Sequence, residues 1–336
     1  AVRGEHSSHK EISMGVPQGS ILGPILFILL INDLPNASKL FFTLLYADDT
    51  TLKISSSDLQ FLYKTANTEL EKLADWFRAN QLTLNISKTK YILFRDKKMN
   101  VDFSDLNLKI DNDNIERIGE DCKEKYFKFV GLHLDEFLTW NHHAKYVHSK
   151  AASTVYSLSK LKNLLPKHVK HTVYTSLFRS YIEFGISCWG GAHNSFIDRI
   201  SILQKRAVRY IDNLKYNFHT GSSFLKFKIL RFKDMVQYNQ ACLMYKYVYD
   251  KLPISFNGMF TKLNSFDRNL SFQLSMASYA NLKKFPSYSI IRLWNSLPLE
   301  LKRKKSLNTF KRHLSLSLSE SYNSPCTKTN CYSCRK

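Results

Sequence analysis

Two neighbouring aspartates between two apolar runs constrain the fold of this chain more than any other feature. Asp48 and Asp49 lie between residues 40–46 and 50–54, which are rich in apolar and β-branched side chains. Two such runs around a short polar turn predict a β-hairpin over residues 40–55. Because strand side chains alternate between faces, the two carboxylates cannot both point into a core. They are suited to bind a hard cation such as Mg²⁺, although for the dipeptide alone a solvated turn is the favoured explanation.

Several further motifs occur in a fixed order around this hairpin. They are the turn formed by Gly15, Val16, Pro17, Gln18 and Gly19; Tyr46 before the aspartates; Lys88 within residues 82–90; the segment formed by Phe129, Val130, Gly131 and Leu132; and a Trp-Asn-Ser-Leu-Pro block at residues 294–298. In this order the motifs resemble the reverse transcriptases, or RNA-directed DNA polymerases, of non-LTR retrotransposons of the jockey-like or LINE type. The resemblance covers most of the chain.

The resemblance implies a role for each motif. Asp48 and Asp49 would be catalytic and would bind two Mg²⁺ ions, which Mn²⁺ can replace, for two-metal nucleotidyl transfer onto a primer 3′ end. Residues 15–19, Tyr46 and Lys88 would lie near the incoming nucleotide and the template, and residues 129–132 would grip the primer. Ordinary structural explanations remain for these segments: a tight turn before a helix, a solvent-facing lysine and an edge strand. Lys90 competes with Lys88 for the same role.

Charge is distributed unevenly along the chain. Residues 1–140 contain 17 basic and 20 acidic residues, a net charge of −3, whereas residues 141–336 contain 32 and 8, a net charge of +24. A surplus of this size predicts a polyanionic partner such as nucleic acid. Lys205, Arg206 and Arg209 recur at helical spacing, and we expect them to contact the phosphates of the nucleic-acid backbone.

We expect an α+β fold. By the resemblance, it would be a partial polymerase palm, with an antiparallel sheet and packed helices, followed by a mainly helical thumb and a basic C-terminal region. Residues 1–95 would form the palm with the catalytic hairpin at 40–55. Residues 96–140 would connect palm to thumb and include the primer-grip strands, residues 141–260 would form the basic thumb, and residues 261–336 the C-terminal region.

Hydrophobic periodicity predicts individual helices within this plan. Residues 25–32 are apolar on all sides, which predicts a helix buried beneath the sheet. A second helix should begin at a cap formed by Ser57 and Asp58 and expose Glu69 to solvent. In the basic half, the spacing of apolar residues predicts two buried stripes, one formed by Val147, Ala151, Val155 and Leu158 and the other by Val169, Val173, Leu177 and Tyr181.

Six cysteines in 336 residues predict a reduced intracellular protein and not a disulfide scaffold. The resemblance implies a nuclear location with a cytoplasmic ribonucleoprotein stage. The longest apolar run is too short to cross a bilayer, so no membrane partner is expected. Cys326, Cys331 and Cys334, with His313, partly resemble a zinc knuckle. Their spacing is irregular for a tetrahedral site, and we therefore favour cysteines without zinc.

The partners that the resemblance implies are an RNA template, a DNA primer and deoxynucleoside triphosphates, together with fingers and endonuclease regions upstream in the same polyprotein. The family has another catalytic aspartate on a strand before the turn at residues 15–19, and only 14 residues precede that turn here. We therefore expect a fragment that is inactive by itself. One alternative is a decayed or co-opted nucleic-acid-binding remnant without catalysis. A structural RNA-packaging module is disfavoured because it would need no carboxylate hairpin.

Overall fold

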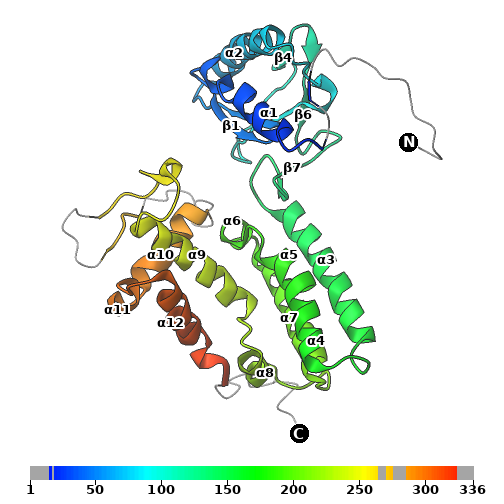
Figure 1. Cartoon of the computed structure of the whole chain (residues 1–336), viewed down its shortest axis with the longest axis vertical. Helices are drawn as coiled ribbons and strands as arrows, with labels where there is room; N and C mark the ends of the chain where they lie inside the picture. The colour runs from blue at the N-terminus through cyan, green and yellow to red at the C-terminus, as the bar shows by residue number, and fades with distance from the viewer. Residues whose placement is uncertain (1–14, 17–18, 264–269, 275–284, 324–336) are drawn as a thin grey trace. The chain divides into compact units, whose positions relative to one another are not determined.

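The computed structural model describes residues 15–16, 19–263, 270–274 and 285–323, and the chain divides into two compact units, Ala1–Glu124 and Lys125–Lys336 (Figure 1). Both helices and strands are present, which confirms the α+β prediction. The division falls inside the segment 96–140 that was expected to connect two domains. None of the described helices combines the length and the apolar content needed to cross a membrane.

The described residues of the first unit form two α-helices and three short strand pairs. The helices are α1 (Gly23–Ile31) and α2 (Leu59–Ala79), and the strands are β1 (Phe42–Tyr46), β2 (Asp49–Lys53), β3 (Lys90–Ile92), β4 (Lys109–Ile110), β5 (Asp113–Asn114) and β6 (Glu116–Ile118). Strand β1 pairs with β2 and β4 with β5, both antiparallel, whereas β3 and β6 are parallel. The expected single antiparallel sheet is therefore replaced, in the described residues, by separate two-stranded ribbons.

Helix α2 supplies more residues to the first unit's core than any other element. Asp58 Oδ1 accepts hydrogen bonds from the backbone N–H groups of Gln60 and Phe61, which confirms the predicted cap. Leu70 and Leu73 are buried in the core that this helix shares with the β-hairpin. The prediction for Glu69 was wrong. Its side chain is buried because its carboxylate accepts hydrogen bonds from the Ser38 hydroxyl and the Lys72 ammonium group, and helical spacing cannot reveal a partner 31 residues away.

Helix α1 differs from the buried helix that its composition predicted. Most of its apolar side chains are exposed, with Ile28 at 57% and Leu29 at 68%. Only Phe27 and Ile31 pack against the core of the first unit. The sequence of a helix that is equally apolar on all sides does not indicate which face packs against the core. Its burial depends on how many other elements of the fold surround it.

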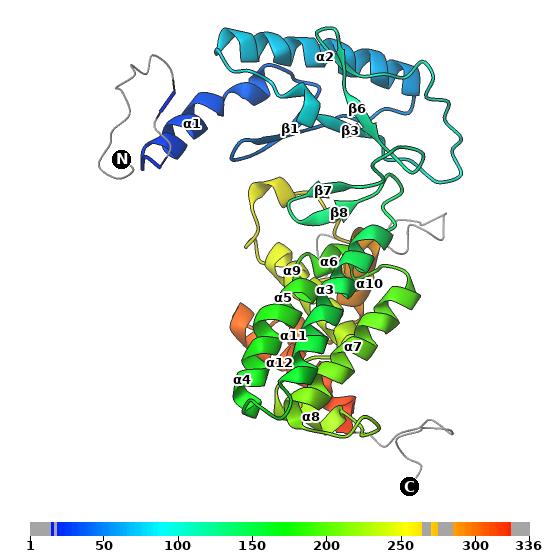
Figure 2. The ribbon, with the colours of Figure 1, turned by 90° about the vertical axis from the view of Figure 1, so that its right-hand side faces the viewer.

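The second unit is a β-hairpin followed by packed helices. The hairpin consists of β7 (Phe127–Phe129) and β8 (Leu132–Leu134). The helices are α3 (Asn141–Lys160), α4 (Lys167–Val173), α5 (Ser180–Glu183), α6 (Ile186–Trp189), α7 (Asn194–Asp212), α8 (Gly221–Lys226), α9 (Phe232–Val248), α10 (Pro286–Ser296), α11 (Leu299–Lys302) and α12 (Leu307–Ser319). Figure 2 shows α3 alongside α7, and α9 packs against both α10 and α12. One core lies around α3 and α7, and a second lies around α9, α10 and α12.

The two stripes predicted for the basic half had different outcomes. The stripe on α3 is confirmed, since all four of its residues are buried. The second stripe was wrong by one position, because α4, a π-helical turn (Tyr174–Arg179) and α5 form a continuous segment that buries Lys170, Tyr174, Phe178 and Ile182 completely. Leu177 is 48% exposed. The large rings of Tyr174 and Phe178 fill the core better than the aliphatic residues beside them, and the Lys170 ammonium group is satisfied by the Lys162 carbonyl and Asn213.

The Trp-Asn-Ser-Leu-Pro block has a structural role in the second unit. Trp294 is fully buried, and its Nε1 donates to the Leu270 carbonyl at 2.8 Å. Asn295 accepts from the Phe272 N–H at 3.0 Å and donates to the Phe272 carbonyl at 2.8 Å. The block therefore holds the segment around residues 270–272 against α10.

Candidate functional site

The predicted β-hairpin is confirmed. Strands β1 and β2 pair from Phe42 with Lys53 to Tyr46 with Asp49, and Ala47 and Asp48 form the turn. Ala47 has a φ angle of 52°, which places a non-glycine residue in the left-handed region. Such strain costs about 1–3 kcal/mol and is concentrated at functional sites. The side chains from Tyr46 to Asp49 are all exposed at this tip.

Neither aspartate carboxylate is used to hold the fold. In the described parts of the chain, Asp48 and Asp49 have no hydrogen-bond or ion-pair partner on their side chains. Adjacent exposed carboxylates with uncommitted oxygens fit Mg²⁺, which prefers hard oxygen ligands and is commonly held by one or two carboxylates plus substrate phosphates. Over the same described residues, no group of three or more potential metal-ligating side chains is found. The donor set therefore fits an ion that shares its coordination with a phosphate ligand.

The turn at residues 15–19 lies just before α1. Gly15 and Gly19 both have positive φ angles, of 86° and 89°, which explains why glycine occupies these positions. A Cβ atom at either glycine would meet no atom within 4 Å, so the backbone there is open. Val16 is exposed, whereas Pro17 and Gln18 lie outside the described residues. This geometry accommodates both interpretations, a turn leading into α1 and a backbone surface open to a ligand.

The structure distinguishes Lys88 from Lys90. Lys88 belongs to a short 3₁₀ turn, Ile86–Lys88. Its side chain is exposed and has no partner among the described residues. Lys90 pairs with Glu116 at 3.2 Å and with Glu124, and its hydrogen bond to Glu124 is the main reason that its pKa is raised. Of the two lysines, Lys88 is therefore the one available to a phosphate.

Residues 129–132 form the turn of the β7–β8 hairpin. Val130 and Gly131 have φ angles of 43° and 86°, as in the two-residue turns that favour glycine. A Cβ atom on Gly131 would lie 3.0 Å from Cε1 of Phe184. Glycine at position 131 is therefore explained by the Phe184 ring of the same unit, which lies close to the backbone there. This packing does not require a bound primer. Val130 remains exposed.

A histidine cluster next to this hairpin was not predicted from the sequence. His143 is buried, and the His133 backbone N–H donates to its Nδ1 at 3.4 Å. Burial, with a smaller effect from His133, lowers the pKa of His143 to about 4, so this ring is neutral at physiological pH. Its edge-on contact with Trp189 is structural. Adjacent histidines at a helix start give no sequence signal that one of them is internal.

Helix α7 presents the basic residues expected to contact phosphates. Lys205 and Arg206 are exposed, but Arg209 is half-buried. Arg209 Nε donates to the Phe218 carbonyl at 2.9 Å, and its guanidinium carbon lies 5.8 Å from the centre of the Tyr216 ring. Arg209 therefore holds the loop after α7, while Lys205 and Arg206 point outward.

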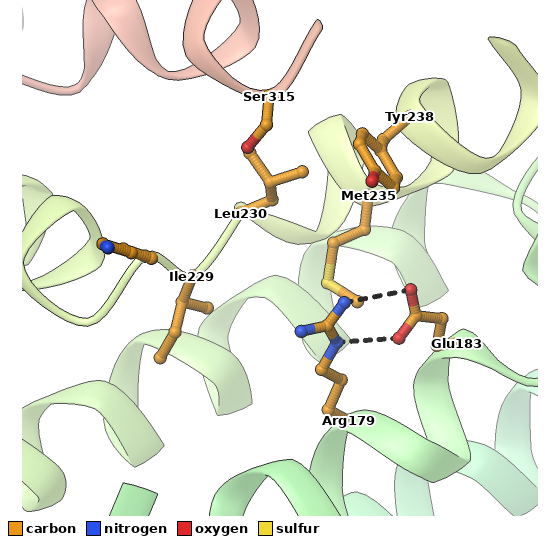
Figure 3. A pocket seen from close by; sticks show the side chains of 8 residues that line it. Arg179, Glu183, Ile229, Leu230, Met235, Tyr238 and Ser315 are labelled. Carbon is orange, nitrogen blue, oxygen red and sulfur yellow. Dashed lines mark hydrogen bonds and ion pairs between the residues drawn. The ribbon is translucent and has the colours of Figure 1, made fainter. Parts of the chain in front are cut away.

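Figure 3 shows a pocket of about 210 Å³ in the second unit. Its polar feature is a two-pronged ion pair in which Arg179 Nε and Nη2 donate to the Glu183 carboxylate at 2.7 and 3.2 Å. Because the Arg179 charge is already neutralised and the volume is below that of typical small-molecule sites, the pocket is explained by helix packing. The three cysteines of the possible zinc knuckle, Cys326, Cys331 and Cys334, lie outside the described residues, and their proposed fourth ligand His313 is half-buried on α12.

Comparison with known proteins adds independent information about the chain. Residues 1–134 match the profile of a family described as reverse transcriptase (RNA-dependent DNA polymerase). Curated relatives from Drosophila melanogaster include the RNA-directed DNA polymerase from mobile element jockey, 24% identical over 70% of this chain and 26% of the relative. Another is the probable RNA-directed DNA polymerase from transposon BS, 28% identical over 72% of this chain and 28% of the relative.

The chain spans about a quarter of the length of these curated relatives. A third relative, the probable RNA-directed DNA polymerase from transposon X-element of the same organism, is 24% identical over 62% of this chain and 23% of its own length. No solved structure matches the chain significantly.

Proposed function

We propose that this chain, whose residues 1–134 match the reverse transcriptase family, is part of a non-LTR retrotransposon polymerase that copies an RNA template onto the 3′ end of a DNA primer. The observation that carries the proposal is the β1–β2 hairpin, whose strained turn exposes two adjacent carboxylates with no structural partner among the described residues. A two-residue hairpin turn accounts for the positive φ angle of Ala47 by itself, but it does not account for two adjacent carboxylates without partners among the described residues.

The hairpin supplies the metal-binding part of the proposed reaction. Asp48 and Asp49 would hold Mg²⁺ ions together with the phosphates of a deoxynucleoside triphosphate. Bound in pairs, such ions stabilise the attacking and leaving oxygens of an in-line phosphoryl displacement. Tyr46 is exposed beside the carboxylates and would contact the primer terminus or the nucleotide. The exposed ammonium group of Lys88 would neutralise charge on the departing pyrophosphate.

The second unit would hold the nucleic acid. Residues 141–336 carry a net charge of +24, and the outward-facing Lys205 and Arg206 are suited to contact phosphates without reading sequence. The β7–β8 turn would contact the primer. In this proposal, the first unit contributes to the palm and the helices of the second unit form the thumb. Fingers and endonuclease regions of the same polyprotein would be further partners. The expected nuclear location belongs to the same proposal, because a chromosomal DNA primer is found there.

The decisive variant is Asp48→Asn, made in the retrotransposon product that carries this chain. We expect primer extension on an RNA template to fall by at least about 1,000-fold, because a carboxylate ligand is lost from the reacting centre. Binding of the primer–template should remain within about twofold. Asp105→Asn is the matched control, since Asp105 is also an exposed acid of the first unit.

Retention of primer extension by Asp48→Asn would contradict the proposal. If the unchanged product binds primer–template but extends no primer with either Mg²⁺ or Mn²⁺, the non-catalytic remnant becomes the better description. Equal losses for Asp105→Asn and Asp48→Asn would show a general effect of charge and not a metal site.

A further inference from the structure

The loop after α7, residues 213–219, is held in place by three cations and is called the pinned loop below. Lys170 Nζ, fully buried, donates to the Asn213 side-chain oxygen. Lys162 Nζ donates to the Leu214 carbonyl at 3.2 Å, and Arg209 Nε donates to the Phe218 carbonyl at 2.9 Å. A backbone hydrogen bond from the Phe218 N–H to the Lys215 carbonyl closes a tight turn inside the loop. These contacts fix the loop at both ends.

The pinned loop holds two aromatic rings in solvent. Tyr216 is 76% exposed and Phe218 is 53% exposed, so neither ring is used to fill a core. The Arg209 guanidinium lies 5.8 Å from the centre of the Tyr216 ring, within the range of a cation–π contact that limits the positions of the ring. Fixing exposed rings in this way lowers the conformational entropy that a partner would otherwise have to remove on binding.

The charge around the pinned loop selects the kind of partner. Residues 199–233 contain nine basic residues and one acidic residue, Asp212. Asp212 is neutralised within the unit, because its carboxylate accepts hydrogen bonds from Lys167 and Lys226, both at 2.8 Å, and from the Ser223 hydroxyl. Lys215 and Arg206 remain exposed. A partner for this surface should therefore combine negative charge with flat apolar faces.

We propose that the pinned loop is a stacking platform for unpaired bases of a nucleic-acid strand, with Tyr216 and Phe218 contacting base faces and Lys215 and Arg206 contacting phosphates. Unpaired bases expose their faces to aromatic side chains, whereas bases inside a duplex are covered by their neighbours. The proposal deepens the proposed function, on which it rests: the second unit would bind single-stranded template or primer in addition to duplex backbone.

The test measures binding of the full chain to a fluorescent single-stranded 16-mer and to a blunt duplex of the same length, by anisotropy and without Mg²⁺. For Tyr216→Ala combined with Phe218→Ala, we expect single-strand affinity to fall by at least about fivefold for each base that loses stacking. Duplex affinity should be unchanged, and so should the slope of log affinity against log salt, because no phosphate contact is removed. Phe61→Ala, which removes a 61% exposed ring from α2, is the matched control and should bind as the unchanged chain does.

A second measurement does not depend on affinity. In Tyr216→Trp, stacking should quench the fluorescence of the new indole when the single strand is added, and the duplex should cause no quenching. Far-ultraviolet circular dichroism and the unfolding midpoint should match those of the unchanged chain, because the replaced rings are exposed.

Two results would overturn the stacking platform: unchanged single-strand affinity in the double variant, or equal losses for single strand and duplex. If the unchanged chain still binds nucleic acid with a steep salt dependence in either case, the proposed function stands without the platform. If the chain binds neither form, both the platform and the proposed binding role of the second unit fail. The Asp48→Asn experiment tests catalysis independently of all these outcomes.

Discussion

The first unit (Ala1–Glu124) and the second unit (Lys125–Lys336) carry opposite charges. Residues 1–124 contain 15 basic and 18 acidic residues, a net charge of −3, while residues 125–336 contain 34 and 10, a net charge of +24. Both units pair some of their acids, and in the first unit Glu69 pairs with Lys72 and Glu116 with Lys90, so the difference lies in the two acids at the hairpin tip. Asp48 and Asp49 have no partner among the described residues of the first unit, whereas the second unit pairs Glu183 with Arg179 and Asp212 with two lysines.

This difference separates two tasks. Acids that are paired inside the basic unit stabilise its fold and leave exposed cations to determine the charge of its surface. The two acids at the tip of the first unit have no stabilising partner among the described residues, so we favour a ligand as the explanation of their position. The comparison is consistent with the proposed division, in which the first unit would hold metal ions and the second a polyanion.

The largest expected effect concerns the core of the second unit. Phe178→Ala should lower the free energy of unfolding by about 3–5 kcal/mol, because a fully buried ring leaves a cavity. Leu177→Ala, one residue away but 48% exposed, should change it by less than about 0.5 kcal/mol. Denaturant unfolding followed by tryptophan fluorescence measures both, since three of the four tryptophans belong to the second unit. Similar losses of unfolding free energy in the two variants would contradict the finding that Phe178 is buried and Leu177 is not.

The next prediction separates Lys88 from Lys90 in the first unit. Lys88→Ala should lower nucleotide incorporation by the longer product about 100-fold, because a cation that assists the leaving pyrophosphate is lost, while stability stays unchanged. Lys90→Ala should instead lower stability slightly, since Lys90 pairs with Glu116 and Glu124. Single-turnover incorporation and thermal unfolding are the measurements. If Lys90→Ala alone reduced incorporation, the choice of Lys88 would be wrong.

A pH-dependent prediction concerns Asp212 in the second unit. Burial acts to raise the pKa of Asp212, but hydrogen bonds from Lys167, Lys226 and Ser223 outweigh it and lower the pKa to about 2. Because the pKa is lower in the folded than in the unfolded chain, the stabilisation is present above about pH 4 and is lost as the pH falls toward 2. Asp212→Asn should be about 2 kcal/mol less stable at pH 7, with the difference shrinking below pH 4.

The control for this titration is Asp105→Asn in the first unit, an exposed acid that should change the unfolding free energy by less than about 0.5 kcal/mol. Denaturant unfolding at pH 7, 4 and 3 provides the data. A difference between Asp212→Asn and the unchanged chain that stayed constant from pH 7 to pH 3 would show that the carboxylate charge is not the cause.

The smallest expected effect is on α1. Ile28→Ser should change the unfolding free energy by less than about 0.5 kcal/mol, because this side chain is 57% exposed. Ile31→Ala on the same helix should cost about 2–4 kcal/mol, because Ile31 is buried in the core of the first unit. The fluorescence of Trp76, the one tryptophan of the first unit, reports on both. A large loss of unfolding free energy in Ile28→Ser would instead support the buried helix that was predicted from the sequence.

Local chemistry made several elements predictable. The apolar runs around Asp48 and Asp49 predicted the hairpin, Asp58 predicted the start of α2, and the stripe on α3 was buried as its spacing indicated. Each depends on residues near one another in the sequence. Three features were not predictable in this way, because their partners are distant in the chain. They are the displaced stripe from Lys170 to Ile182, the buried Glu69 and the buried His143.

The sequence by itself determined that this protein combines a carboxylate hairpin with a strongly basic helical half, and its ordered motifs determined the family resemblance. Charge, periodicity and motif order are properties of the amino-acid sequence and do not depend on the folded structure. Only the tertiary structure decided which charges are already used. Lys90, Arg209 and Asp212 form ion pairs or hydrogen bonds, whereas Lys88, Asp48 and Asp49 have no such partner among the described residues. The physical reason is that a charge is available to a ligand only when no distant part of the chain has folded back to neutralise it.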